Sequence, residues 1–209
     1  MTFFRNALSS FALIAACAAP LVGHAATNLV VNGSFEQGAG GIGSFTGWTT
    51  TLGDAATFVD SSGVTGTLAG DASDGLWSAY FGSTAADGGA TISQTLTTRA
   101  GQRYVLSFDV ANSNGGLAAV NSFLASVAGT QVFSLTNAAA QGYVHESFTF
   151  AASGASTLLS FAASNDNDYL QLDNVSVTAV VPEPSSAALM LATLVAGAGV
   201  GVARRARRR

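Results

Sequence analysis

Few side chains in the central part of this 209-residue chain can do acid, base or nucleophilic chemistry. Between residues 26 and 181 there is one histidine, His145, and no cysteine, which excludes Cys/His catalysis and zinc sites built from several histidines. His145 stands beside Glu146 without a nucleophile-elbow motif nearby, so a Ser/His/Asp site has no support. The acidic side chains offer no pair that stands out as the two carboxylates of a glycosidase. We therefore expect a protein that is not an enzyme.

Two acidic residues stand where the apolar pattern of a strand ends or changes phase. Glu36 ends the run Asn-Gly-Ser-Phe-Glu at residues 32–36. Near Asp173 the apolar residues change from even to odd positions, and a β-bulge is the usual way to absorb one extra residue. If the first and last strands meet, Glu36 and Asp173 could share a hard cation such as Ca²⁺ with backbone carbonyls. The alternative is that both are solvated acids at strand ends.

Aromatic side chains are the second group with a chemical use, because a ring can stack on the C–H face of a sugar. The candidates are Trp48, Trp77, Tyr80, Tyr143 and Tyr169. Residues three apart in a strand face opposite ways, so Trp77 and Tyr80 cannot both point inward, and we expect one of them to be exposed.

A polar loop at residues 165–168 adds a further candidate. Its first residues, Asn165 and Asp166, could contact a sugar or a second cation. The candidate ligand-binding residues are thus Trp77, Tyr80, Asn165 and Asp166. For each aromatic residue core packing is the alternative role, and for the loop it is a solvated turn.

The segments that must position these residues alternate with period two, which is typical of half-buried strands. Gly, Ser, Asn and Asp clusters separate them, and Gly129-Thr130 fits a hairpin turn. About ten short strands predict an all-β fold, an antiparallel jelly-roll β-sandwich. The expected strands cover residues 29–35, 47–52, 57–60, 76–81, 90–97, 104–110, 121–128, 131–136, 143–151, 157–163 and 169–180.

Charge is distributed unevenly along the chain. Residues 26–181 contain eleven acidic residues and only two basic ones, Arg99 and Arg103, a net charge of −9. A body without lysine has few counterions to release from a polyanion, so binding to nucleic acid or anionic lipid is not expected. Cations, neutral sugars or a basic partner fit better. The length suits one domain.

The last 29 residues, 181–209, have three parts in a fixed order. Pro182, Glu183 and Pro184 come first, and an uncharged apolar run follows at residues 187–203. As a helix its 17 residues would span about 26 Å, slightly less than a bilayer core of about 30 Å. Five arginines end the chain and predict a cytoplasmic tail. A buried core helix is the alternative for the apolar run.

This order and spacing resembles the PEP-CTERM sorting signal of Gram-negative bacteria. The resemblance covers residues 181–209 only. It implies a single C-terminal transmembrane helix, transient anchoring in the inner membrane, and removal of the tail by an exosortase, a membrane protease-transpeptidase. Pro182, Glu183 and Pro184 would then be the sorting motif that this enzyme recognises.

Residues 1–25 have the pattern of a secretory signal peptide: Arg5 near the start, an apolar stretch, and small residues Gly23 and Ala25 at the −3 and −1 positions. Signal peptidase would therefore be a processing partner. Cleavage after Ala25 also removes Cys17, the only cysteine, so no disulfide would form outside the cell. The alternative is a lipoprotein box that leaves a lipidated Cys17.

The body at residues 26–180 is similar to galactose-binding-like jelly rolls, including carbohydrate-binding modules. The similarity rests on residues 28–36, Gly47-Trp48, residues 101–108 and residues 172–177. In several such modules the matching carboxylates hold a structural calcium, which the resemblance implies only for Glu36 and Asp173. Asn174 stands where a second acid is more usual.

Together these features predict an exported protein of the cell surface or extracellular matrix that binds exopolysaccharide without catalysis. The alternative is a structural or adhesive biofilm matrix protein with no specific glycan ligand.

Overall fold

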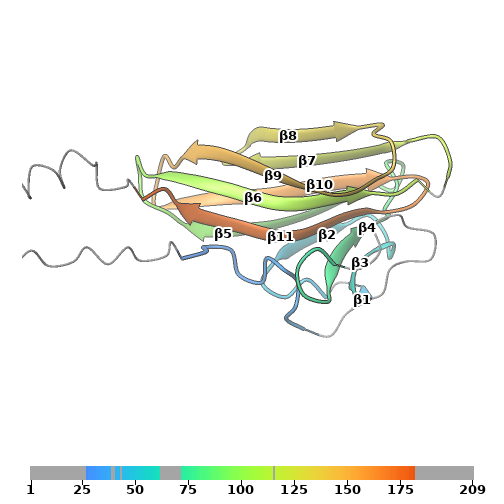
Figure 1. Cartoon of the computed structure of the whole chain (residues 1–209), viewed down its shortest axis with the longest axis horizontal. Coiled ribbons are helices and arrows are strands. Elements are labelled where there is room, and N and C mark those ends of the chain that lie inside the picture. The colour runs from blue at the N-terminus through green and yellow to red at the C-terminus, as the bar shows by residue number, and fades with distance from the viewer. Residues whose placement is uncertain (1–26, 39–40, 43, 62–71, 115, 182–209) are drawn as a thin grey trace, which may run out of the picture.

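The computed structural model describes residues 27–38, 41–42, 44–61, 72–114 and 116–181. These residues form two antiparallel sheets packed face to face, an all-β sandwich consistent with a jelly roll (Figure 1). The expected fold class is thus confirmed for the body. The signal peptide, the apolar run at 187–203 and the motif Pro182–Pro184 lie outside the described residues. No helix within the described ranges is long and apolar enough to cross a membrane.

The first sheet has six strands in the order β1-β3-β4-β11-β6-β9. Their bounds are β1 (Gly41–Ile42), β3 (Thr57–Asp60), β4 (Ser78–Phe81), β11 (Leu170–Ala179), β6 (Arg103–Asn112) and β9 (Gln141–Ala151). The second sheet has five strands in the order β2-β5-β10-β7-β8. Their bounds are β2 (Thr49–Leu52), β5 (Ala90–Thr97), β10 (Ser156–Asn165), β7 (Asn121–Val127) and β8 (Thr130–Thr136).

The core lies between the sheets and is rich in phenylalanine. Alternate residues of β6, β7 and β10 bring Phe108, Phe123 and Phe161 together, each fully buried. Their ring centroids are 5.2 to 6.0 Å apart, within the range of favourable aromatic pairs. Burial of these large side chains fixes the register, since a slip of one residue would turn them toward solvent.

Two local predictions about β turns and bulges are confirmed. Val127 pairs with Thr130, so Ala128 and Gly129 form a two-residue hairpin turn, one position earlier than expected. Both have positive φ, 51° and 78°, as a type I′ turn requires. In β11 the pairing with β6 shifts between Asp173 and Ser176, which is the bulge that the change of apolar phase indicates.

The first expected strand, residues 29–35, is wrong. Asn32 and Phe35 have φ values of 53° and 58°, in the left-handed region, and these two interruptions within four residues prevent a regular strand. The segment still runs beside β11, because Leu29 N donates to Val177 O at 2.8 Å and Val175 N donates to Gly33 O at 2.9 Å. A Cβ on Gly33 would lie 1.9 Å from Val175 O, so only glycine allows this approach.

Candidate functional site

The strands of the five-stranded sheet carry no charge. None of its five strands contains Asp, Glu, Lys, Arg or His. Across the strands Ser160 pairs with both Ser93 and Ser126, and the neighbouring row joins Thr91, Ala162 and Leu124. Small hydroxyl and alanine side chains therefore form a neutral surface in a body whose net charge is strongly negative.

This neutral face contains a hollow of about 240 Å³. Its floor consists of outward residues of β5, β7 and β10, and the loop at residues 84–89 forms its wall. The hydroxyl groups of Thr91, Ser122 and Ser164 line it together with the apolar surfaces of Leu124 and Ala162. A concave surface with a few hydroxyls and an apolar floor suits a small neutral ligand.

Hydrogen bonds hold the wall of the hollow in place. Asp166 Oδ1 accepts the Ala85 N–H at 3.0 Å, and Gly89 N donates to Thr84 O at 2.9 Å. Gly53 N donates to Gly89 O at 2.8 Å, which ties the loop to the end of β2. The hollow is thus formed before any ligand arrives.

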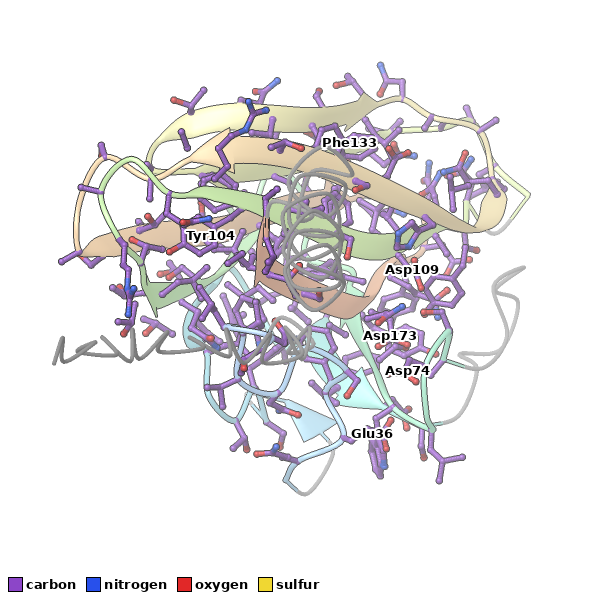
Figure 2. The ribbon with its side chains drawn as sticks, turned by 60° about the vertical axis from the view of Figure 1, so that its left-hand side comes forward. Glu36, Asp74, Tyr104, Asp109, Phe133 and Asp173 are labelled. Atoms are coloured by element: carbon purple, nitrogen blue, oxygen red, sulfur yellow. The ribbon has the colours of Figure 1, made fainter. Side chains whose placement is uncertain are left out.

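The outer face of the six-stranded sheet is chemically different. Asp173 on β11 pairs with Asp109 on β6, which in turn pairs with His145 on β9. Figure 2 shows Glu36, Asp74, Asp173 and Asp109 following one another along this side of the molecule. The two central carboxylates are buried, with exposed fractions of 0% for Asp173 and 9% for Asp109.

Polar neighbours from three segments hold these two carboxylates. Ser73 Oγ donates to Asp109 Oδ2 at 2.8 Å and lies 3.2 Å from Asp173 Oδ2. Asn174 bonds both acids, with its backbone N–H on Asp173 at 2.7 Å and its amide on Asp109 at 3.1 Å. His145 Nδ1 lies 2.6 Å from Asp109 Oδ1. We call Asp109, Asp173, Ser73, Asn174 and His145 the acid network.

The acid network separates the pKa values of its two carboxyl groups. Burial raises the pKa of Asp173 to about 7, against the hydrogen bonds from Asp74, Asn174 and Ser73. Burial also acts to raise the pKa of Asp109, but bonds to His145, Ser73 and Asn174 outweigh it and leave that pKa below its ordinary value. Asp173 is the carboxyl group that holds a proton near neutral pH.

The order of contacts argues against nucleophilic catalysis here. In a Ser/His/Asp triad the histidine stands between the nucleophile and the acid. In the acid network Asp109 stands between Ser73 and His145 instead. His145 therefore cannot take a proton from Ser73 directly.

The predicted calcium ligands, Glu36 and Asp173, bind two ends of one segment, residues 72–77. Glu36 Oε1 accepts the N–H groups of Leu76 and Trp77 at 2.6 and 2.7 Å. Asp173 Oδ2 accepts the Asp74 N–H at 2.9 Å. A calcium ion would compete with these donors. Within the described ranges, no group of three or more His, Cys, Asp or Glu side chains is arranged to hold a metal ion.

The four predicted sugar-binding residues do not form one surface. Tyr80 is outward on β4 but only 1% exposed, and Trp77 is half-buried against the core, so neither is the exposed ring that we expected. Asn165 is 1% exposed because it bonds Ser113 O inside a group of buried asparagines. Asp166 is exposed and holds the wall of the hollow through Ala85.

Sequence reasoning did not identify two features of these faces. The hollow is lined by small residues that carry no sequence signal. On the other face, Gln171 and Ser78 are fully buried, and Gln171 Oε1 and Nε2, Ser78 Oγ and Tyr143 Oη have no hydrogen-bond partner in the described part of the chain. Gln171 alternates with Leu170 and Leu172 as any outward polar residue does, so the sequence pattern gave no sign of its burial. We call Gln171, Ser78 and Tyr143 the polar cluster.

Solved structures with this architecture include carbohydrate-binding modules. The module TmCBM61, solved in complex with β-1,4-galactotriose, is 14% identical with a TM-score of 0.53, covering 74% of this chain and 99% of that one. The enzymatically active domain of bacteriophage CBA120 tailspike protein 4 is 17% identical with a TM-score of 0.50, covering 73% and 21%. A family 16 carbohydrate-binding module is 16% identical with a TM-score of 0.48, covering 72% and 99%.

At these identities the solved structures show the shared fold alone. No curated protein matches the chain. A family model does match, over residues 28–177, which is nearly the whole sandwich from the segment beside β11 to the last part of β11. The chain belongs to the family described as "Protein of unknown function (DUF642)".

Proposed function

We propose that this protein binds a neutral polysaccharide without catalysis, through the hollow on the five-stranded sheet. The observation that carries the proposal is the contrast between that face and the rest of the body. Eleven acidic residues lie between residues 26 and 181, yet none lies in the five strands that form the face. A neutral surface with hydroxyl groups gives no advantage to a charged ligand, and it can exchange hydrogen bonds with a neutral sugar.

The size and lining of the hollow support a sugar unit as the occupant. About 240 Å³ is below the usual range for drug-sized ligands, about 300–1,000 Å³. The methyl groups of Leu124 and Ala162 offer an apolar floor for sugar C–H groups, and three hydroxyls can bond the ring hydroxyls. The shared fold with TmCBM61, whose structure contains β-1,4-galactotriose, suggests a galactan as the first ligand to test.

The experiment is to fill the hollow from its floor. Ala162→Phe should markedly weaken binding of the purified protein to neutral polysaccharides in affinity electrophoresis, because the ring occupies the space of the ligand in the hollow. Galactan, a neutral glucan, anionic alginate and cationic chitosan form the test panel.

The matched control is Ser160→Phe. Ser160 points outward from the same strand two residues earlier and does not line the hollow. Its substitution adds the same ring to the same face, so binding should persist. Galactan and glucan binding by Ala162→Phe as strong as that of the native protein, or binding confined to chitosan, would contradict the proposal.

We propose further that the protein is exported and matures at the cell surface or in the extracellular matrix. The PEP-CTERM-like segment 181–209 supports processing by an exosortase after transient inner-membrane anchoring, and residues 1–25 support signal peptidase. Mass spectrometry of the surface form tests both. A mature mass that still includes the arginines at residues 204–209 would contradict exosortase processing.

The second candidate function is a structural or adhesive matrix protein. The uncharged five-stranded face favours it, because copies of an acidic protein repel each other least where neither carries charge. Sedimentation of the purified protein decides between the two functions. Self-association without binding to any glycan of the panel would support the structural role.

Calcium binding by Glu36 and Asp173 stays a prediction. An ion that binds only the folded protein raises the melting temperature by mass action, even where it displaces N–H groups of the segment 72–77 from the two carboxylates. The test compares thermal melting with excess Ca²⁺ and with a chelator. Equal melting temperatures would end the calcium hypothesis.

A further inference from the structure

The polar cluster lies on the side of the sandwich opposite the hollow. Gln171 and Ser78 have exposed fractions of 0%, and four of the cluster's side-chain polar atoms have no hydrogen-bond partner in the described part of the chain. Buried polar atoms without partners cost free energy, and native proteins keep few of them. Four such atoms at one place call for a specific occupant.

Strand pairing places the cluster's members near one another. Gln171 on β11 lies directly opposite Tyr80 on β4, and Ser78 is the next outward residue of β4. The Tyr143 hydroxyl lies close enough to Ser78, Tyr80 and Asp173 for each to influence its pKa, although it meets Ser78 without hydrogen-bond geometry. Tyr143 therefore reaches from β9 across β6 and β11 toward Ser78 on β4, which makes its ring the candidate roof of the cluster.

The chemistry of these groups matches a neutral sugar. A glutamine amide offers a donor and an acceptor side by side, which suits two adjacent hydroxyls of one sugar ring. The Ser78 hydroxyl can both donate and accept a hydrogen bond, so it can add a contact to a neighbouring sugar hydroxyl. The neighbouring carboxylates Asp109 and Asp173 disfavour an acidic sugar.

Tyr143 is the residue of this site that neighbouring strands restrain least. Tyr143 stands on β9, an edge strand, and follows Gly142, which has no neighbour within 4 Å of an added Cβ. The floor strands β4 and β11 are paired on both sides. A rotation of Tyr143 would therefore open the cluster without breaking the sheet.

We propose that the polar cluster is a second binding site, closed by Tyr143 in this structure, for a neutral sugar unit. The inference rests on the proposed function at the hollow and extends it. With one site on each side of the sandwich, the protein bridges two polysaccharide chains. Such a bridge makes the avidity for a polymer exceed the affinity for its oligosaccharide.

Gln171→Met is the decisive variant, because methionine keeps the length of the side chain and removes both amide atoms. If the amide serves a ligand, ligand-free Gln171→Met melts higher than the native protein, by about 2–4 °C, since an unpaired buried group has been removed. If bound water satisfies the amide as part of the fold, the variant melts lower, and the proposal is overturned.

Binding stoichiometry gives an independent test with β-1,4-galactotriose as the probe. Native protein should bind two molecules by calorimetry. Ala162→Phe and Gln171→Met should each bind one, and the double variant none. Tyr143→Ala should tighten the remaining site of Ala162→Phe about fivefold or more, because the roof no longer has to move.

The outcomes separate this inference from the proposed function. One molecule bound by native protein, lost in Ala162→Phe and kept in Gln171→Met, overturns the second site and leaves the proposed function intact. One molecule bound and lost only in Gln171→Met places the sugar at the cluster and contradicts the hollow. No binding of any glycan of the panel contradicts both.

Discussion

The two sheets of this sandwich share a core but present opposite chemistry to the outside. The five-stranded sheet has an uncharged face of small hydroxyl and alanine side chains with a preformed hollow. The six-stranded sheet has buried carboxylates, a histidine and polar atoms that find no partner among the described residues. The neutral face therefore costs the fold little, whereas the polar face requires precise contacts with residues 72–77 and 174.

The difference teaches where sequence changes will matter for stability and where they will matter for binding. Contacts on the six-stranded side join segments far apart in the chain, such as Glu36 with Leu76 and Ser73 with Asp109. The outward side chains of the five-stranded sheet contact mainly their neighbours in the sheet. We expect large stability effects on the first side and small ones on the second.

The largest effect is expected from a glycine on the six-stranded side. Gly75 has a φ of 70°, and an added Cβ would lie 2.3 Å from Glu36 Oε1. Gly75→Ala should lower the free energy of unfolding by about 2–3 kcal/mol, because backbone strain adds to displacement of the Glu36 carboxylate from two N–H groups. Urea denaturation measures the loss.

The matched control is Gly88→Ala in the loop beside the hollow. Gly88 also has positive φ, 90°, but an added Cβ meets nothing within 4 Å. It should cost only the strain, about 1 kcal/mol. Equal losses in the two variants would mean that the Glu36 contact contributes nothing to stability.

The second effect concerns Asp109, which accepts bonds from Ser73 and Asn174 and lies against His145. Asp109→Asn should cost about 2 kcal/mol, since charge-assisted hydrogen bonds are lost in a mostly buried place. On the neutral face Ser160→Ala should stay within about 0.5 kcal/mol. A cost for Ser160→Ala as large as that for Asp109→Asn would erase the contrast between the faces.

The fold was largely predictable from the sequence because period-two patterns record burial directly. The strands at 57–60 and 90–97 have the expected bounds, and the change of apolar phase located the bulge after Asp173. The prediction of a strand at residues 29–35 failed for a physical reason. Val30 and Phe35 are in the core while Val31 is exposed, because the chain is irregular there, with Asn32 and Phe35 in the left-handed region.

The site was less predictable because it depends on which residues meet across the sheets. Tyr80 and Asn165 were expected at a sugar surface, yet both are buried by neighbours distant in sequence. Gln171 has the ordinary position of a polar strand residue, and only the side chains around it show that its amide has no partner in the ranges that the structure describes. Much of the lining of the hollow is Ala and Gly, and neither residue type indicates a binding site in a sequence.

The third prediction uses pH to separate the two faces. Burial raises the pKa of Asp173 to about 7 in the folded protein, whereas the unfolded chain releases this proton near the ordinary value of 3.8. The folded state thus holds an extra proton between these values, and stability falls as pH rises from about 4 toward 7. The lowered pKa of Asp109 has the opposite effect on stability: as the pH falls below the ordinary value of 3.8, protonation of Asp109 destabilises the folded protein.

Asp173→Asn should flatten this slope, as measured by the urea midpoint at pH 5 and at pH 8. The titratable neighbours of Asp173 are Asp74, Asp109, His145 and Tyr143, and all four stay in the variant. Thr91→Val on the neutral face should leave the slope unchanged. A native protein equally stable at both pH values would refute the assignment of the proton to Asp173.

The smallest effect tests how a new charge is tolerated on each face. Thr95→Glu places an acid on the exposed side of β5, opposite Leu158 and far from other charges in its sheet. Ser147→Glu places the same acid on β9, opposite Ser107 and two residues from His145, close to Asp109.

At about 1 M salt both variants should change the free energy of unfolding by less than about 0.5 kcal/mol. At about 0.01 M salt the Debye length grows to about 30 Å, so Ser147→Glu should become the less stable variant through repulsion from the acid network, while Thr95→Glu changes less. Equal salt dependence of the two variants would show that the negative charge acts on the whole body and not on one face.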